Sequence, residues 1–273
     1  MSGRRRQGPL IAADMSKSDS PRTNALLAAL PVAVFNRLQP SLQAVQLEVG
    51  ETLFLQGGKL RFAYFPTSSI VTSSYAADAN GAMAKAWPVG REGVVGISLF
   101  LGNPKRENRA DVQIGGLAYR LPAEVLLAEF RGAGEMQRLL LRYVFALVTQ
   151  ASQLSICNAH HATDQRLGRF LLRIFDRVST PDVAITQDRI SALLGVRRVS
   201  ITQAAGQLQA AGIIEYRRGR IKLVDAKRLE ERSCACAGLI RRAFAAVPAK
   251  PAGASHPRIL LAPARVRQVL AFP

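Results

Sequence analysis

The stretch ITQDRISALLGVRRVSITQAAGQLQAAGIIEYRRGRIKLVD, residues 185–225, decides how this chain is interpreted. Apolar residues recur in its first part at helical spacing, and Gly195 can adopt the positive φ that a sharp turn between two helices requires. The second predicted helix, residues 197–211, is rich in small residues that permit close helix packing. After Gly212 the sequence alternates like two strands around a turn at Arg218. This order predicts a helix-turn-helix followed by a basic hairpin wing.

Polar side chains are predicted to occupy the outer face of this unit. Arginine can bind guanine in bidentate fashion, glutamine can do the same for adenine, and a helix N-terminus attracts phosphate. Arginines on a wing suit contacts to the DNA backbone. A solvated charged face would account for the wing arginines but not for the grouping Arg-Arg-x-Ser-x-Thr-Gln. The predicted DNA-binding residues are Thr186, which is also the expected N-cap of the first helix, Arg197, Arg198, Ser200, Thr202, Gln203, Arg217, Arg218 and Arg220.

The distribution of charge supports a nucleic-acid partner. The 273 residues carry a formal net charge of +18, which favours nucleic acid over an anionic membrane surface. Residues 181–245 contribute +6, whereas the much longer stretch 23–180 contributes +5. A localised basic segment is typical of a nucleic-acid-binding module. The competing hypothesis is a nonspecific basic nucleic-acid-binding protein, driven by charge alone.

In the preceding part of the chain, the sequence pattern changes from one typical of strands to one typical of helices. Between residues 47 and 121, short apolar runs such as TLFLQ, RFAYF and SIVTSSY alternate with Gly, Pro and Asn, which predicts an antiparallel sandwich or barrel. From Glu135 the sequence EMQRLLLRYVFALVTQASQLSICN continues for about six turns without Gly or Pro. Its heptad seam predicts a dimerisation helix, and the alternative is a helix lying on its own β-domain. The seam residues are Met136, Leu140, Tyr143, Leu147, Gln150, Leu154 and Cys157.

The predicted fold class is α+β, with five segments along the chain. No apolar run reaches the roughly 18 residues of a membrane-spanning helix, and no signal peptide is evident. We therefore expect a soluble cytoplasmic protein with no membrane partner. Met1 and Met15 are both compatible with the true start of the chain. The predicted segments are a disordered basic tail (1–22), a β-roll sensor domain (23–133), the dimerisation helix (134–158), a winged helix-turn-helix DNA-binding domain (159–240) and a low-complexity tail (241–273).

The order of these parts resembles the Crp/Fnr family of bacterial transcription regulators. The resemblance spans about residues 25–240 and includes VGETLFLQGG and FAYFPTSSIV in the strand-rich part. It implies a cyclic-nucleotide-binding-like jelly roll and a homodimer on a palindromic site, with double-stranded promoter DNA and RNA polymerase as partners. The family's base-contacting positions fall on Arg198, Val199 and Gln203, where the common pattern is Arg, Glu and Arg. Because two positions depart, and Val199 offers only apolar contact, the operator should differ from the family consensus.

The expected effector pocket also departs from the resembled family. Members that bind cyclic nucleotides carry Gly-Glu before an Arg-x-Ala-type segment, so that a carboxylate holds the ribose and an arginine neutralises the phosphate. Here Ile97 follows Gly96, and Arg109 is out of register. Losing the carboxylate removes a hydrogen bond typically worth about 1.5–3 kcal/mol, so cyclic AMP is not the expected effector. The candidate pocket residues are Arg91, Glu92, Gly96 and Arg109, with a solvated loop as the favoured alternative.

The cysteines do not predict a disulfide framework or a metal site. Their number, three, suits a reducing compartment. Cys157, His160 and His161 have helical spacing, but a buried thiol beside exposed histidines is the favoured interpretation. Cys234 and Cys236 cannot alone complete a four-thiolate site, and redox chemistry there is a weak hypothesis. We therefore expect no metal, no cofactor and, since hydrolase, P-loop and zinc-protease motifs are missing, no enzymatic activity.

Overall fold

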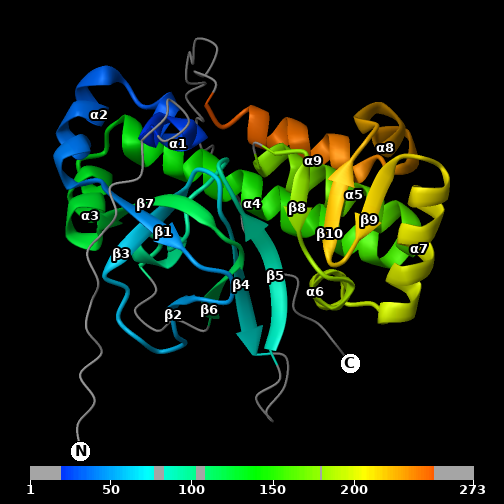
Figure 1. The fold of residues 1–273 in the computed structure, drawn as a ribbon. Coiled ribbons are helices and arrows are strands. Elements are labelled where there is room, and N and C mark those ends of the chain that lie inside the picture. The colour runs from blue at the N-terminus through cyan, green and yellow to red at the C-terminus, as the bar shows by residue number, and fades with distance from the viewer. Residues whose placement is uncertain (1–19, 77–82, 103–107, 179, 249–273) are drawn as a thin grey trace, which may run out of the picture.

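The computed structural model describes residues 20–76, 83–102, 108–178 and 180–248. An N-terminal β-roll and a C-terminal winged helix-turn-helix are joined by a long helix (Figure 1). This confirms the predicted fold class, α+β with an antiparallel roll, a long helix and a winged helix-turn-helix. The predicted tails lie outside the described residues over 1–19 and 249–273.

The roll is built from two antiparallel sheets with strand orders β1-β7-β3 and β2-β6-β4-β5. Phe65 on β3 lies opposite Tyr119 on β7, and Ala63 lies opposite Leu121. All four side chains are buried, so period-two alternation directs one face of this sheet into the core. The strands are β1 (Gln43–Leu47), β2 (Thr52–Phe54), β3 (Phe62–Pro66), β4 (Ile70–Ala76), β5 (Met83–Val89), β6 (Asn108–Ile114) and β7 (Gly116–Pro122).

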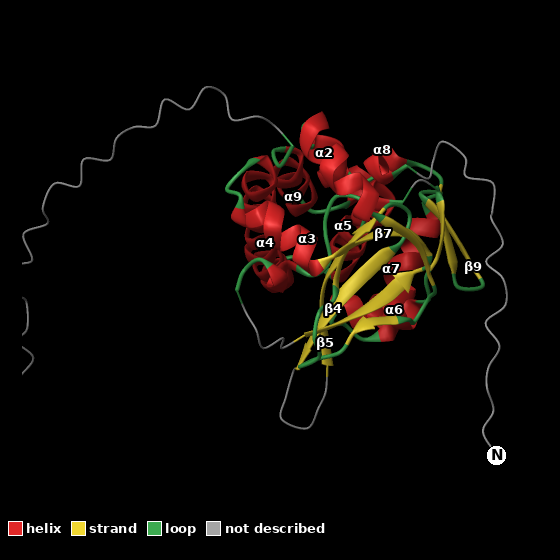
Figure 2. Ribbon diagram, turned by 90° about the vertical axis from the view of Figure 1, so that its left-hand side faces the viewer, coloured by secondary structure: helices red, strands yellow, loops and turns green. Residues whose placement is uncertain are grey.

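Helices cover one side of the roll, as Figure 2 shows for α3, α4 and α9 beside strands β4, β5 and β7. Asn24 caps the first helix, and its side-chain amide donates hydrogen bonds to Pro66 O at 2.9 Å and Gly93 O at 2.8 Å. Pro31 separates the first two helices because it lacks an N–H group. The elements are η2 (Pro21–Thr23), α1 (Ala25–Ala29), α2 (Val32–Leu38), η3 (Gln39–Ser41), η4 (Ile97–Leu99), α3 (Ala123–Arg131) and α4 (Glu135–His160).

Helix α4 carries two apolar stripes, and the predicted seam is the one that faces inward. Met136, Leu140, Tyr143 and Leu147 are at most 4 % exposed, and they pack into the core shared with the roll. The prediction that this seam forms a dimer interface is therefore wrong, and the alternative, a helix lying on its own β-domain, describes this face. Heptad spacing identifies an apolar stripe but not what covers it. A second stripe remains exposed and consists of Leu141, Phe145, Val148 and Ile156.

The C-terminal winged domain is built around an apolar cluster formed mainly by α5, α6, α7 and a three-stranded sheet of order β8-β10-β9. Arg189 on α6 donates a hydrogen bond to Gln113 O of the roll at 3.0 Å. Ile70 and Ile114 of the roll belong to the same apolar cluster as the helix-turn-helix, so the two parts are packed together. The elements are α5 (Thr163–Arg177), β8 (Asp182–Ala184), α6 (Gln187–Leu194), α7 (Arg198–Ala210), β9 (Ile214–Arg217), β10 (Arg220–Leu223) and α8 (Ala226–Arg232).

The last described helix, α9 (Cys236–Ala245), crosses the predicted boundary between the DNA-binding domain and the low-complexity tail. Ile240, Phe244 and Val247 are buried in the core that α4 shares with the roll. The chain therefore returns from the winged domain to the roll, so the folded part of the chain does not end at residue 240. The sequence did not predict this helix because its amphipathic pattern extends over only about three turns and lies in a segment rich in Ala and Arg.

One described helix, α4, is long and apolar enough to cross a membrane by length and composition. No uninterrupted apolar run marks this helix because Arg142 interrupts it, whereas a mean hydropathy over 18 residues tolerates one arginine. A single helix of this kind is weak evidence for a membrane span, since core helices of soluble proteins meet the same criterion. Its inner stripe packs against the roll.

Candidate nucleic-acid interface

Helices α6 and α7 meet through the turn that the sequence predicted. Thr186 is the N-cap of α6, and its hydroxyl accepts a hydrogen bond from Arg189 N at 3.3 Å. Gly195 ends α6 with φ 62° and ψ 41°, a left-handed conformation that glycine adopts at little cost. Ile190 and Leu194 from α6 pack against the buried residues of α7, which are Ile201, Ala204, Ala205 and Leu208. At the start of α7, Ile201 therefore faces the core and Val199 faces solvent.

The outer face of α7 presents a compact polar group. Arg197, Arg198, Thr202 and Gln203 are exposed, and Ser200 is half-buried. Val199 is 58 % exposed, which places an apolar side chain among them. Arg197, the N-cap residue, makes no side-chain capping hydrogen bond, so first-turn amides are available to an anion. These residues were predicted to contact DNA, and the fold brings them to one surface.

Hydrogen bonds hold this surface in a defined arrangement. Arg198 Nε lies 3.3 Å from Asp188 Oδ1, with both side chains about two-thirds exposed. Thr202 Oγ1 donates to Gln187 Oε1 at 2.6 Å. Tyr216 Oη of the wing accepts a hydrogen bond from Gln187 N at 3.2 Å. Arg198 must therefore exchange one exposed carboxylate partner for a base or phosphate, an exchange with a small cost because surface ion pairs are weak.

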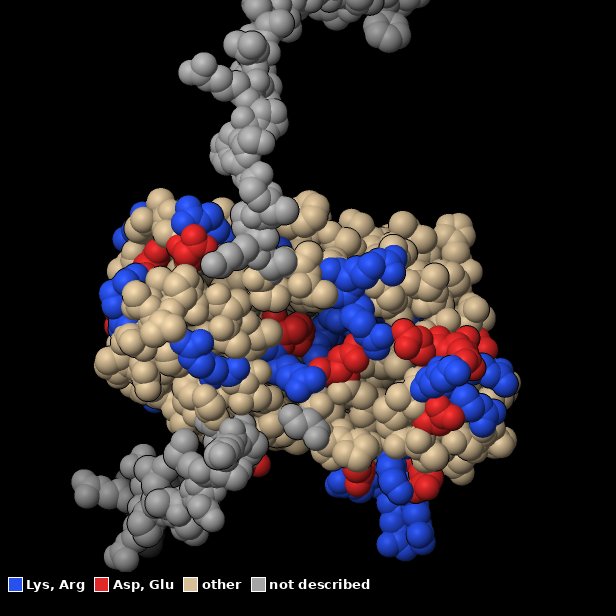
Figure 3. Space-filling view, turned by 90° about the horizontal axis from the view of Figure 1, so that it is seen from above, with Lys and Arg blue, Asp and Glu red and all other residues tan. Residues whose placement is uncertain are grey.

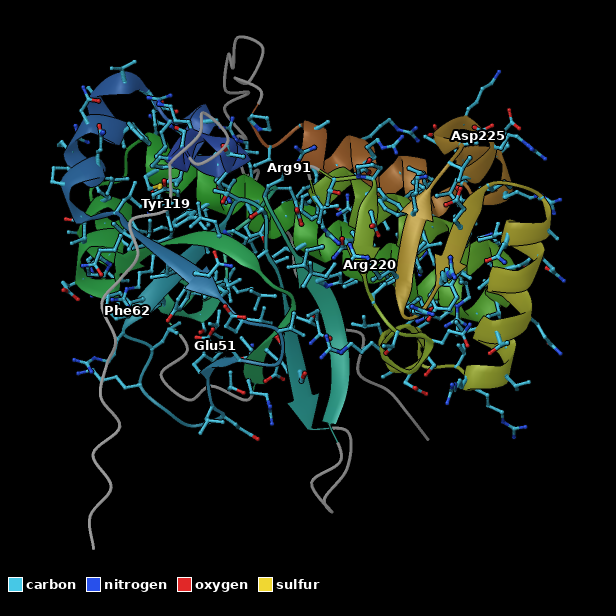
Figure 4. All side chains as sticks on the ribbon, viewed as in Figure 1. Glu51, Phe62, Arg91, Tyr119, Arg220 and Asp225 are labelled. Atoms are coloured by element: carbon cyan, nitrogen blue, oxygen red, sulfur yellow. The ribbon has the colours of Figure 1, made fainter. Side chains whose placement is uncertain are left out.

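The wing turns at Arg218 and Gly219, whose φ angles of 49° and 75° fit a tight hairpin. Arg220 pairs with Asp182 at 2.9 Å and Lys222 pairs with Glu215 at 3.5 Å. Figure 4 labels Arg220 on the wing strand β10. Arg217 and Arg218 are exposed at the tip, and no carboxylate of the described chain forms an ion pair with either. The tip thus carries the wing's uncompensated positive charge.

The two domains meet at an ionic junction, where Figure 3 shows basic and acidic side chains side by side between the roll and the winged domain. Arg91, labelled there in Figure 4, donates from Nε to Asp176 O at 2.9 Å. Glu92 accepts a hydrogen bond from Arg177 Nε at 2.6 Å, and Arg177 is 2 % exposed. Arg91 and Glu92 were predicted as effector-pocket residues. Their side chains make the contact between the roll and α5, and both also line a pocket at this junction.

Buried polar partners complete this junction. Arg173 is buried, donates to Gln150 Oε1 on α4 at 3.0 Å, and lies over the ring of Phe244 at 4.7 Å. Burial, with Arg177 as the next cause, lowers the pKa of Arg173. Glu92 therefore pairs directly with one buried arginine, Arg177, and its charge, together with that of Asp176, also favours the charged form of Arg173.

The roll contains a cavity of about 180 Å3. Gly96 lines it, with φ 107° in the left-handed region, and the inner face of α4 contributes Tyr143 and Leu147. The described residues of the lining carry no formal charge. Its other lining residues are Phe54, Ser73, Tyr75, Val89, Val94, Val95, Ile97, Ser98, Leu101 and Asn108.

Arg109 does not join this lining. Its Nη2 lies 2.6 Å from Asp111 Oδ1 and 3.2 Å from Thr52 Oγ1. The hydrogen bond to the Asp111 carboxylate raises the pKa of the guanidinium. Of the four predicted pocket residues, the structure therefore places Gly96 at the cavity, Arg109 beside it on β6, and Arg91 and Glu92 at the domain junction.

A cluster of sulfur and nitrogen ligands lies where α4 ends. The side-chain atoms of Cys157, His161, Cys234 and Cys236 that could bind a metal lie within 4.8 Å of one another. Burial, followed by the thiol of Cys157, raises the pKa of Cys234 to about 12. His160 is exposed and does not belong to the cluster. The sequence did not predict this cluster because the pair at 157 and 161 and the pair at 234 and 236 carry no local signal that they meet.

Helix, left-handed turn, exposed second helix and basic wing define a winged helix-turn-helix DNA-binding domain. Residues 165–232 match the family model of the Crp-like helix-turn-helix domain. The chain therefore carries a Crp-like helix-turn-helix domain, and its fold is shared with solved structures of Crp/Fnr type over 71–81 % of its length. A comparison with curated proteins found no match.

Solved structures share this architecture at low sequence identity. FixK2 from Bradyrhizobium japonicum is 17 % identical with a TM-score of 0.60, and the match covers 71 % of this chain and 98 % of that one. A protein from Ruegeria pomeroyi, described as a candidate cyclic nucleotide binding protein, is 23 % identical with a TM-score of 0.58, covering 79 % and 96 %. A candidate Crp/Fnr regulator from Eubacterium rectale is 18 % identical with a TM-score of 0.53, covering 81 % and 99 %.

Proposed function

We propose that this chain regulates transcription in the cytoplasm by binding a palindromic promoter site as a homodimer, with α7 in the major groove of each half-site. The observation that carries the proposal is the exposed group Arg197, Arg198, Thr202 and Gln203, positioned by a packed helix-turn-helix beside a basic wing. Helix N-termini of this kind read bases, whereas wings hold the DNA backbone. A nonspecific basic protein needs the charge but not this ordered face.

Individual roles follow from the chemistry of the side chains. Arg198 would bind guanine O6 and N7, Gln203 would bind adenine, and Val199 would contact a thymine methyl group. The wing arginines Arg217 and Arg218 would contact phosphates. Substitution of a base reader should therefore change specificity, whereas substitution of a wing arginine should weaken binding to all sequences.

The exposed stripe of α4 is the surface that favours a homodimer. Phe145 is 73 % exposed and Val148 is 57 % exposed on a helix whose opposite face is already buried. Contiguous exposed apolar side chains of this kind mark association surfaces. Two copies of α4 pairing here would set the distance between the two α7 helices, which must match one turn of DNA.

The effector proposal follows from the cavity in the roll. Its volume of about 180 Å3 is below the 300–1,000 Å3 of typical small-molecule pockets, and its described lining offers no cation for a cyclic phosphate. We therefore do not expect cyclic AMP to bind. A smaller effector would act by population shift, biasing α4 and so the spacing of the two α7 helices, and RNA polymerase would be the downstream partner.

The test begins by selecting a binding site from random DNA and then measures affinity for that site and for a scrambled version over a range of salt concentrations. Specific binding predicts a large difference that persists as salt weakens both complexes, whereas a nonspecific binder gives equal affinities throughout. Arg198→Ala should weaken binding to the selected site by about 1–3 kcal/mol, roughly 5- to 150-fold. Arg138→Ala is the matched control, because Arg138 also forms an exposed ion pair, with Glu135 at 2.6 Å. Equal losses in the two variants would refute base reading by Arg198.

A further inference from the structure

Four potential metal ligands converge from two distant parts of the chain. Cys157 belongs to the last turn of α4, and His161 is the residue that ends that helix. Cys234 lies in the short link between α8 and α9, and Cys236 is the first residue of α9. Cys157 Sγ and Cys234 Sγ are 3.5 Å apart, as are Cys236 Sγ and His161 Nδ1. The arrangement is therefore Cys-x3-His from one segment and Cys-x-Cys from the other.

These separations fit the edges of a tetrahedron around one ion. With Zn–S near 2.3 Å and Zn–N near 2.0–2.1 Å, tetrahedral geometry places two sulfur ligands about 3.8 Å apart and a sulfur and a nitrogen about 3.6 Å apart. The two distances of 3.5 Å are within a few tenths of an ångström of these values, and all four ligand atoms lie within 4.8 Å of one another. An iron–sulfur cluster is wider than a single ion and requires its ligand atoms to stand farther apart. The geometry thus favours a mononuclear site.

The residues around the cluster bury it and hold its side chains in place. The three cysteines are between 0 and 4 % exposed, whereas His161 is half-buried and offers a route of entry. Gln153 Nε2, one turn before Cys157, donates to Cys236 Sγ at 3.1 Å, the kind of hydrogen bond that orients a thiolate ligand. At Gly168 on α5 an added Cβ would lie 3.2 Å from Ser233 Cα, so this glycine lets α5 pack tightly behind Cys234.

We propose that Cys157, His161, Cys234 and Cys236 bind a single tetrahedral zinc ion. Thiolate and imidazole ligands in tetrahedral geometry select zinc over magnesium, calcium or manganese. Each thiol that becomes a ligand releases its proton to solvent, and His161 binds as neutral imidazole. Three thiolates and one dication leave the site with one net negative charge. A closed set of four protein ligands is typical of a structural zinc site and leaves no position for a substrate.

Such an ion would connect the parts of the chain that must move together. Two ligands lie at the end of α4, and the other two lie just before and at the start of α9. Helix α9 leads away from the winged domain and packs on α4 near the roll. Zinc would therefore fix the returning segment to the helix that precedes α5, and with it the orientation of the winged domain. Metal binding itself does not depend on the proposed function, whereas its effect on DNA affinity does.

The experiment uses the full chain. Elemental analysis of protein reconstituted with zinc and then desalted should give one zinc per chain. Cobalt added to the metal-free protein should produce the visible bands of tetrahedral Co²⁺ together with thiolate-to-cobalt charge transfer. Cys157→Ser and Cys234→Ser should each lower zinc affinity at least tenfold, and Gln153→Leu should lower it about 10- to 100-fold. His160→Gln, a change beside His161 at an exposed position, should bind zinc like the unmodified chain.

Two results would overturn the proposal, and both come from the unmodified chain, so they do not depend on the folding of a variant. The first is less than stoichiometric zinc after reconstitution together with no tetrahedral cobalt spectrum. The second is intact-mass evidence that Cys157 and Cys234 form a disulfide under reducing conditions in which zinc should bind. Stoichiometric zinc with unchanged DNA affinity would support the zinc site and refute its link to DNA binding. The effect of Arg198→Ala on DNA affinity tests the proposed function alone and does not bear on the zinc site.

Discussion

The junction between the roll and the winged domain leads to a sharp prediction about Glu92. Its carboxylate forms the 2.6 Å ion pair with Arg177, whose side chain is 2 % exposed. Arg173 lies next to Arg177 and is also buried. Replacing Glu92 with leucine would leave the buried guanidinium of Arg177 without its carboxylate partner and would remove one of the two favourable carboxylate charges that act on Arg173. Removing one partner of a buried pair typically costs about 3–5 kcal/mol, and the second arginine places this site at the upper end of that range.

The expected loss is measurable as a change in melting temperature. At roughly 2–4 °C per kcal/mol for chains of comparable size, 3–5 kcal/mol corresponds to a decrease of about 6–20 °C. Glu135→Leu is the control, because Glu135 pairs with Arg138 in the open, with the two side chains 45 % and 58 % exposed. An exposed pair contributes about 0–1 kcal/mol, so the control should melt within a few degrees of the unmodified chain.

The double variant Glu92→Leu/Arg177→Met tests the cause of the loss. If the cost comes from an unpaired buried charge, removing both partners should recover much of the stability, since apolar residues of similar volume often replace buried ion pairs without loss. Differential scanning calorimetry and urea denaturation of the unmodified chain, Glu92→Leu, Arg177→Met and the double variant would measure the coupling free energy. A single variant no less stable than the control, or a double variant as unstable as the single, would refute this account of the junction.

Two further predictions concern α4. Phe145→Glu, at an exposed position of the outer stripe, should shift the chain from dimer to monomer in sedimentation velocity, while the far-ultraviolet circular dichroism of the folded monomer is retained. Val32→Glu is the control, because Val32 is 66 % exposed on α2, and it should leave the dimer intact. Gly93→Ala places a Cβ in overlap with Tyr143 Oη, so overpacking of about 1–3 kcal/mol is expected in chemical denaturation. Adding Tyr143→Phe to Gly93→Ala should restore part of that loss, and no restoration would contradict the assignment of the strain to Tyr143.

The helix-turn-helix could be predicted from sequence in detail because its signals are local. Thr186 as N-cap, Gly195 at positive φ and the turn at Arg218 each depend on neighbours within a few residues. The exposed face of α7 followed from the same helical period that buries Ile201. Local chemistry and tertiary packing agree here, and such agreement is what makes a segment predictable.

Features that depend on distant contacts could not be predicted in the same way. The seam of α4 was identified as apolar, but sequence spacing does not distinguish a partner helix from the chain's own roll. Glu92 and Arg177 are 85 positions apart, and Cys157 and Cys234 are 77 apart, so neither pair leaves a pattern in a local window. The same limit explains why the contact of Arg91 with Asp176 of α5 could not be predicted.

The inner face of α4 suggests how these separate features could act as one device. Tyr143 and Leu147 line the cavity in the roll, Gln150 accepts from Arg173 at the junction, and Cys157 belongs to the thiol cluster. These positions follow one another along a single buried stripe, while the exposed stripe lies on the other side of the same helix. A ligand that displaced Tyr143 would therefore move a helix whose next turns hold the winged domain. Because α4 is one continuous helix from Glu135 to His160, a displacement at the cavity need not pass through a loop to reach the residues that contact α5. A variant that stabilises the junction should therefore make DNA affinity less responsive to a ligand bound in the cavity.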